Sequence, residues 1–236
     1  MLAKTGQWRH ASARHEAVQE ALRIPPDQRQ EALWLAVANE VERVGTESHQ
    51  RTDALAAGRD VPSLGADHGE YAENLTEALG QWHDIRALQP LITIQGGMLA
   101  TVPIVQFGEA AVTPLIDAVR NGHWSQHAGA LMGLQILLEG WSTSPYNIPP
   151  ANLSAKARSD VLILARDLLR PKHTEWGELG SVAGLALATG DQELRGQLEL
   201  LAAEPGIVSQ FTGLVDVTKI QMVQNSIKAR LDRHPK

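Results

Sequence analysis

The residues best suited to chemistry are two histidines four positions apart. His123 and His127 have the i, i+4 spacing that places two metal ligands on one face of a helix. The residues between them are tryptophan, serine and glutamine, so the glutamate that acts as general base in zinc proteases is missing. No third ligand follows at a recognisable spacing. We therefore predict no metal and no cofactor, and we place His123 in the turn before a helix that contains His127.

Other catalytic patterns are missing as well. The chain has no cysteine, which excludes a thiolate metal site and a cysteine nucleophile. It lacks the Gly-x-Ser-x-Gly motif of hydrolases and the glycine-rich motifs that cradle nucleotide phosphates. Glu70, Glu73 and Glu77 recur at helical spacing, which is typical of a solvated helix face. The sequence therefore favours a protein without enzymatic activity.

The charge balance bears on partners and on location. The 236 residues include 27 acidic and 21 basic side chains, and the excess of acids lies in residues 1–118. An acidic surface repels phosphate, which disfavours nucleic-acid binding. The longest uncharged stretch, residues 87–108, is interrupted by glutamines, prolines and glycines, and the chain begins without an apolar signal-peptide core. We expect a cytoplasmic protein that does not cross a membrane.

Helical periodicity runs along nearly the whole chain. Apolar residues recur every three or four positions, and glycine, proline or aspartate stands at the ends of these stripes. No convincing strand pattern interrupts them. We predict an all-α fold of roughly eleven short helices, with Ser154 and Asp191 as helix caps. The clearest predicted helices span residues 27–45, 154–171, 178–189, 191–205 and 218–231.

The spacing of the helices suggests a single all-α domain over residues 1–236. Residues 1–60 form N-terminal helices without a recognisable repeat, and residues 82–205 form paired helices. Between the helical blocks, residues 140–153 read GWSTSPYNIPPANL. Because Trp141, Tyr146 and Ile148 give this segment apolar anchors, we interpret it as an inserted surface loop.

One motif repeats within the paired helices. Pro-Leu-Ile occurs at 90–92 and at 114–116, and the second copy lies in FGEAAVTPLIDAVRNGHWSQHAGALMGLQILL, residues 107–138. This segment resembles a HEAT repeat of the armadillo-type family, and residues 190–195 resemble the family's Asp-x-x-Val-Arg corner. The resemblance implies an α-solenoid in which stacked helix pairs cover one another. Because the offset is shorter than the family's repeat of roughly 40 residues, and Gln126-His127 occupies the corner, we predict an irregular α-α superhelix.

A second resemblance concerns metal chemistry. His15-Glu16 resembles the repeated His-Glu pairs of deoxyhypusine hydroxylase, a HEAT-repeat di-iron enzyme. In that family several such pairs supply the iron ligands. This chain contains a single His-Glu pair, which cannot hold two metals.

Three functions follow from this sequence. The leading prediction is a non-enzymatic protein-interaction or scaffold module, whose protein partner the sequence does not identify. The first alternative is a nucleic-acid-binding protein that resembles the HEAT-like DNA glycosylases, and the second is a histidine-dependent metal or small-ligand protein. Because aromatic side chains dominate binding hot spots, the predicted interaction surface consists of His123, Trp124, His127, Trp141 and Tyr146.

Overall fold

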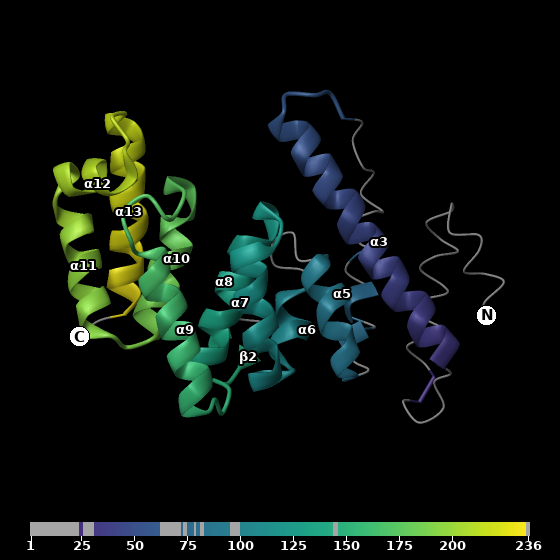
Figure 1. Ribbon diagram of the computed structural model, residues 1–236. Coiled ribbons are helices and arrows are strands. Elements are labelled where there is room, and N and C mark those ends of the chain that lie inside the picture. The colour runs from purple at the N-terminus through teal and green to yellow at the C-terminus, as the bar shows by residue number, and fades with distance from the viewer. Residues whose placement is uncertain are drawn as a thin grey trace. The chain divides into compact units, whose positions relative to one another are not determined.

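The computed structural model describes residues 24–25, 31–61, 72, 75–77, 79–80, 83–94, 100–143 and 146–234. Most of these residues are helical, and they include one two-stranded sheet (Figure 1). The predicted all-α fold is therefore confirmed. Within the described part of the chain, no helix is long and apolar enough to cross a membrane.

The chain divides into two compact units, residues 1–130 and residues 131–236. The boundary falls inside helix α8 (Trp124–Glu139), so this one helix contributes to both units. The prediction of a single domain over the whole chain stays a prediction.

The first unit is built around a long helix and a series of short ones. Helix α3 packs against α5, and α5 packs against α7. Both Pro-Leu-Ile motifs lie near helix starts, on α5 and α7 respectively. The described elements are α3 (Glu31–Ala56), η2 (Ile85–Ala87), α5 (Leu88–Thr93), α6 (Thr101–Val105), η3 (Gly108–Ala111), α7 (Val112–Asn121) and the first turns of α8.

Helix α3 is longer than the sequence indicated. We expected Gly45 to end it, but the helix continues to Ala56. The glycine serves packing instead, because a Cβ at this position would lie 2.8 Å from the backbone of Thr93 and Ile94 at the end of α5. Glycine is tolerated within a helix when another backbone must approach this closely.

The second unit packs several helices around α13. Helices α10 and α11 contact α13, and α9 contacts α10. Both predicted caps are confirmed, since Ser154 Oγ accepts from the Ala157 N–H and Asp191 Oδ1 accepts from the Leu194 N–H. The elements after α8 and its following hairpin are α9 (Ala155–Leu168), η4 (Trp176–Glu178), α10 (Leu179–Ala188), α11 (Gln192–Ala203), α12 (Pro205–Thr212) and α13 (Val217–Arg233).

The segment predicted as an inserted loop contains a small β-hairpin. Strand β1 (Trp141–Thr143) pairs antiparallel with β2 (Tyr146–Ile148), and Trp141 lies opposite Ile148. No strand was expected here, and the hairpin corrects that expectation, whereas the interpretation of residues 140–153 as an inserted surface loop stays a prediction. Strands of three residues are too short to show a period of two in the sequence, so the hairpin gave no readable signal.

Three glutamines join helices in the same way. In each case the side-chain amide of a later helix donates to carbonyl oxygens at the C-terminal end of an earlier one. Carbonyls in the last turn of a helix lack the usual N–H donor four residues later, and the glutamines supply a donor at these positions. The contacts are Gln126 of α8 to Ile92 and Thr93, Gln197 of α11 to Leu169, and Gln224 of α13 to Leu201 and Ala202.

Candidate functional site

The best-defined cluster of polar and aromatic side chains lies where α3 meets the start of α8. We call it the α3–α8 junction and define it as His49, Asp53, His123, Trp124 and Ser125. His49 and Asp53 are one turn apart on α3. His123 immediately precedes α8, as predicted, and accepts the backbone N–H of Gln126 on its carbonyl oxygen.

A reciprocal cap fixes the start of α8. The backbone N–H of His123 donates to Oε1 of Gln126 at 2.9 Å, and the N–H of Ser125 donates to Nδ1 of His123 at 3.3 Å. The arrangement resembles a capping box, but an imidazole nitrogen replaces the usual hydroxyl oxygen and accepts the N–H of Ser125, one residue earlier than in the standard motif. Because Gln126 is 5% exposed, a buried side chain supports the turn.

Asp53 receives two hydrogen bonds from the other side of the junction. Nε2 of His123 and Nε1 of Trp124 each lie 2.9 Å from Oδ1 of Asp53. Since Nδ1 of His123 accepts from Ser125, the neutral ring carries its proton on Nε2 and donates it to Asp53. The indole N–H of Trp124, followed by His123, holds the pKa of Asp53 below its usual value, because both stabilise the carboxylate.

The second histidine lies flat against the first. The rings of His49 and His123 are stacked with their centroids 4.3 Å apart and their planes 11° from parallel. Nε2 of His49 is buried and has no hydrogen-bond partner among the residues described. Burial, followed by the neighbouring His123, lowers the pKa of His49, so the neutral ring is favoured.

At the junction a serine contacts a histidine, which in turn contacts an aspartate. These are the three residue types of a hydrolase catalytic triad. Oγ of Ser125 lies 2.7 Å from Nδ1 of His123, whose Nε2 contacts Asp53. In a hydrolase, free backbone N–H groups beside the nucleophile stabilise the oxyanion. Here the N–H groups of Ser125 and Gln126 both bond to His123 itself. The arrangement therefore caps a helix and is not that of an acyl-transfer site.

Metal binding at the junction is not favoured by its geometry. Two stacked imidazoles direct their nitrogens within parallel planes and do not converge on one point. Across the described ranges, no group of three or more histidine, aspartate or glutamate side chains is arranged to hold a metal ion. His15-Glu16 lies outside the described residues, so its metal chemistry stays a prediction.

The five residues of the predicted interaction surface fall in different units. His123, Trp124 and His127 belong to the first unit, and Trp141 and Tyr146 to the second. Trp124 is 51% exposed, whereas His123 and His127 are half-buried. Trp141 is half-buried on strand β1.

Sequence reasoning missed the α3 side of the junction. His49 and Asp53 have the same i, i+4 spacing that drew attention to His123 and His127. They were overlooked because Gly45 was expected to end the helix before them. An N-terminal helix pattern extended past this glycine would have placed both side chains on one helix face.

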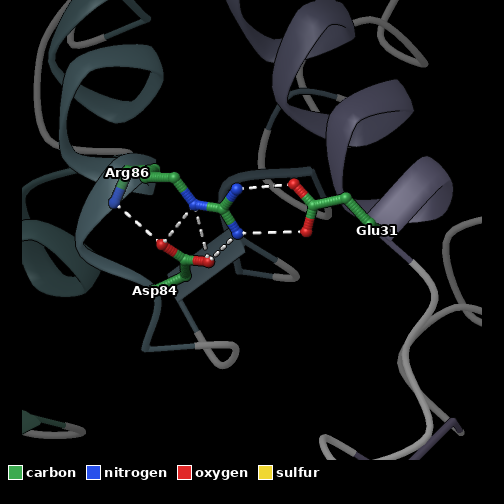
Figure 2. Close-up of polar contacts among 3 residues, drawn as sticks. All are labelled: Glu31, Asp84 and Arg86. Carbon is green, nitrogen blue, oxygen red and sulfur yellow. Dashed lines mark hydrogen bonds and ion pairs between the residues drawn. The ribbon is translucent and has the colours of Figure 1, made fainter.

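A separate cluster of charges joins the start of α3 to η2 (Figure 2). Arg86 forms ion pairs with Glu31 and with Asp84, and its guanidinium lies 4.2 Å from the ring centre of Trp34. Asp84 also caps η2 by accepting the backbone N–H of Arg86 at 2.9 Å. Arg86 lowers the pKa of both carboxyl groups by donating hydrogen bonds to them. Each of the three charged groups, Glu31, Asp84 and Arg86, has a partner within the cluster, so we interpret it as structural.

Two arginines of the C-terminal half are engaged with protein carboxylates. Arg166 pairs with Asp191 and Glu193, and Arg170 pairs with Asp167. Paired guanidinium groups carry little net positive charge for phosphate neutralisation. These contacts lend the nucleic-acid alternative no support.

No family model, curated protein or solved structure matches this chain. The HEAT resemblance stays a prediction based on residues 107–138 and 190–195. At the second of these segments, Asp191 caps α11 and also accepts from Arg166 of α9 at 2.7 Å. The backbone N–H of Leu194, followed by Arg166, keeps the pKa of Asp191 low.

Proposed function

We propose that this protein is a non-enzymatic protein-interaction module, and that Trp124 at the α3–α8 junction is a principal contact for its partner. The observation that carries the proposal is an exposed tryptophan held in a fixed position. About half of Trp124 is exposed to solvent, while its indole N–H donates to Asp53. The centroid of its ring lies 5.6 Å from that of His123.

A fixed aromatic side chain is suited to binding for an energetic reason. Ordering a flexible side chain at an interface costs about 0.5–1.5 kcal/mol, and a side chain that is already ordered avoids most of this cost. Trp124 is anchored to α3, 71 residues earlier in the chain, through a hydrogen bond that leaves much of the indole exposed. Tryptophan is also among the residues most enriched at binding hot spots.

We further propose that the helices form an irregular α-α superhelix of the HEAT type. The support is the recurrence of one contact, in which a glutamine of a later helix bonds to the carbonyl end of an earlier helix. Gln126, Gln197 and Gln224 each make it. Such contacts tie neighbouring helices together where the family would have a ladder of aspartate–arginine pairs. One pair of that kind is present, between Asp191 and Arg166.

The test compares proteins captured from a cell extract by the full chain and by Trp124→Ala. A protein captured by the parent chain would be purified, and its affinity measured directly by calorimetry. Loss of a hot-spot side chain costs 2 kcal/mol or more, which is roughly a 30-fold weaker Kd. Leu200→Ala is the matched control, because Leu200 is 56% exposed and lies on α11 in the second unit.

The proposal predicts that the purified partner binds Leu200→Ala as well as it binds the parent chain. Binding to Trp124→Ala should be weaker by roughly 30-fold or more, with unchanged helical content by circular dichroism. Equal affinity for all three proteins would show that Trp124 is not the contact. If the parent chain and Trp124→Ala capture the same proteins in equal amounts, the result would also count against the proposal.

A further inference from the structure

We propose that the stacked pair of His49 and His123 is a proton-operated latch at the α3–α8 junction. The closed junction accommodates at most one proton on the two rings beyond their neutral forms. A second proton separates α3 from the start of α8 and releases Trp124. The opening follows from the junction itself, whereas its consequence for binding rests on the proposed function.

One proton fits the closed geometry because His123 faces an oxygen from each ring nitrogen. Nε2 lies 2.9 Å from the carboxylate of Asp53, and Nδ1 lies 2.7 Å from Oγ of Ser125. A charged His123 would donate to both oxygens. It would give up only the weaker contact in which Nδ1 accepts from the backbone N–H of Ser125.

The closed junction does not accommodate a second proton, because a protonated Nε2 of His49 would have no acceptor for its hydrogen bond. Nε2 of His49 is buried, and no acceptor lies within hydrogen-bond distance of it among the described residues. Charging this ring would also set two cations face to face with their centres 4.3 Å apart.

The groups that act on His49 come from each element packed around it. They are His123 at the start of α8, Asp53 on α3 itself, and the backbone of Thr93 on α5. Asp53 and Thr93 favour the charged ring, but burial and His123 outweigh them, so the pKa of His49 is lowered. The oxygen of Asp53 that faces the junction is already shared by His123 and Trp124.

The direction of the pH effect follows from this lowered pKa. A histidine freed from the junction has a pKa near 6.5, so the open form binds the proton more readily than the closed form. The free-energy advantage of the closed form is therefore complete above about pH 6.5 and decreases as the pH falls below that value. The open-to-closed ratio then rises by up to tenfold per pH unit, until the lower pKa of His49 in the closed form is reached.

The experiment follows the indole N–H of Trp124 by nuclear magnetic resonance in the full chain between pH 8 and pH 5. The signal is assigned from its absence in Trp124→Phe. Histidine ring resonances recorded in the same samples report the protonation of His49 and His123 directly. We expect the Trp124 indole to be protected from solvent exchange at pH 8 and to lose that protection below about pH 6.5, as His49 becomes charged.

The matched variants separate the latch from a general effect of acid. His49→Phe keeps a ring in the stack but cannot take a proton, and should hold Trp124 protected to lower pH. His173→Gln removes an exposed histidine from the second unit and should leave the parent behaviour unchanged. If His49→Phe does not fold, the parent titration decides alone. Both histidines charged with Trp124 still protected would overturn the latch.

The latch and the proposed function can fail separately. Loss of Trp124 protection on acidification, together with an affinity that Trp124→Ala does not weaken, would leave the latch standing without the proposed binding role. Conversely, a partner that depends on Trp124, combined with protection that does not change between pH 8 and pH 5, would retain the binding role and eliminate the latch.

Discussion

Replacing Gln126 with alanine should destabilise the first unit more than any exposed substitution. The side chain makes three hydrogen bonds to backbone groups. Its amide donates to the carbonyls of Ile92 at 2.8 Å and Thr93 at 3.2 Å, and its oxygen accepts from the N–H of His123 at 2.9 Å. One residue therefore joins the end of α5 to the start of α8.

The expected magnitude follows from these contacts. A hydrogen bond contributes about 1 kcal/mol net, and a buried group left without a partner costs about 1–3 kcal/mol. Ile92 is 3% exposed, so water does not readily replace the lost donor at its carbonyl. Thr93 and His123 are half-buried and recover part of their bonding from solvent. We expect Gln126→Ala to lower the free energy of unfolding by about 2–3 kcal/mol.

Urea unfolding followed by far-ultraviolet circular dichroism measures this loss. The matched control is Gln221→Ala, because Gln221 is an exposed helical glutamine whose amide bonds to Asn225, one turn away on the same helix. That change should cost less than about 0.5 kcal/mol. A loss below about 0.5 kcal/mol for Gln126→Ala would show that the glutamine contact does not hold the helices together.

Gln126→Glu tests the direction of the hydrogen bonds. The substitution keeps an acceptor for His123 but turns a carboxylate toward the two carbonyls of α5. Burial among these oxygens should raise the pKa of the new carboxyl group. Its protonated form can donate one hydrogen bond, so the loss of stability relative to the parent chain should be smaller at pH 5 than at pH 8. Equal destabilisation at both pH values would contradict the assigned donor and acceptor roles.

Four further substitutions test contacts elsewhere in the chain. Gly45→Ala should destabilise by about 1–3 kcal/mol through overpacking against α5, whereas Gly196→Ala, where a Cβ meets nothing within 4 Å, should stabilise α11 by up to about 1 kcal/mol in the same urea assay. Asp191→Ala should cost about 1–2 kcal/mol through its lost cap. The backbone N–H of Leu194, followed by Arg166, lowers the pKa of Asp191 in the folded protein. The cost should therefore be present at neutral pH and shrink as acid protonates the carboxyl group of the parent chain. Trp141→Ala should reduce stability by about 0.2–1 kcal/mol through its lost cross-strand pair, with helical content unchanged by circular dichroism.

Local features could be predicted from the sequence because their causes lie within a few residues. The caps at Ser154 and Asp191 depend on a backbone N–H three positions later, and both are present. The apolar stripe of the last helix is also present, with Ile220, Val223 and Ile227 buried. The site could be predicted only in part. His123 and Trp124 were singled out by residue type, whereas the α3 residues that hold them were not.

The sequence by itself determined the helical class of this protein, since an apolar period of 3.6 residues and short-range caps act through the local chain. Tertiary structure decided the length of α3 and the composition of the junction. In the sequence Gly45 indicates the end of a helix, and only the approach of the α5 backbone makes it a packing residue within α3. His49 and His123 are 74 positions apart, and no local pattern relates them. Their stacking results from the packing of helices that burial of apolar surface brings together, and the same burial lowers the pKa of His49.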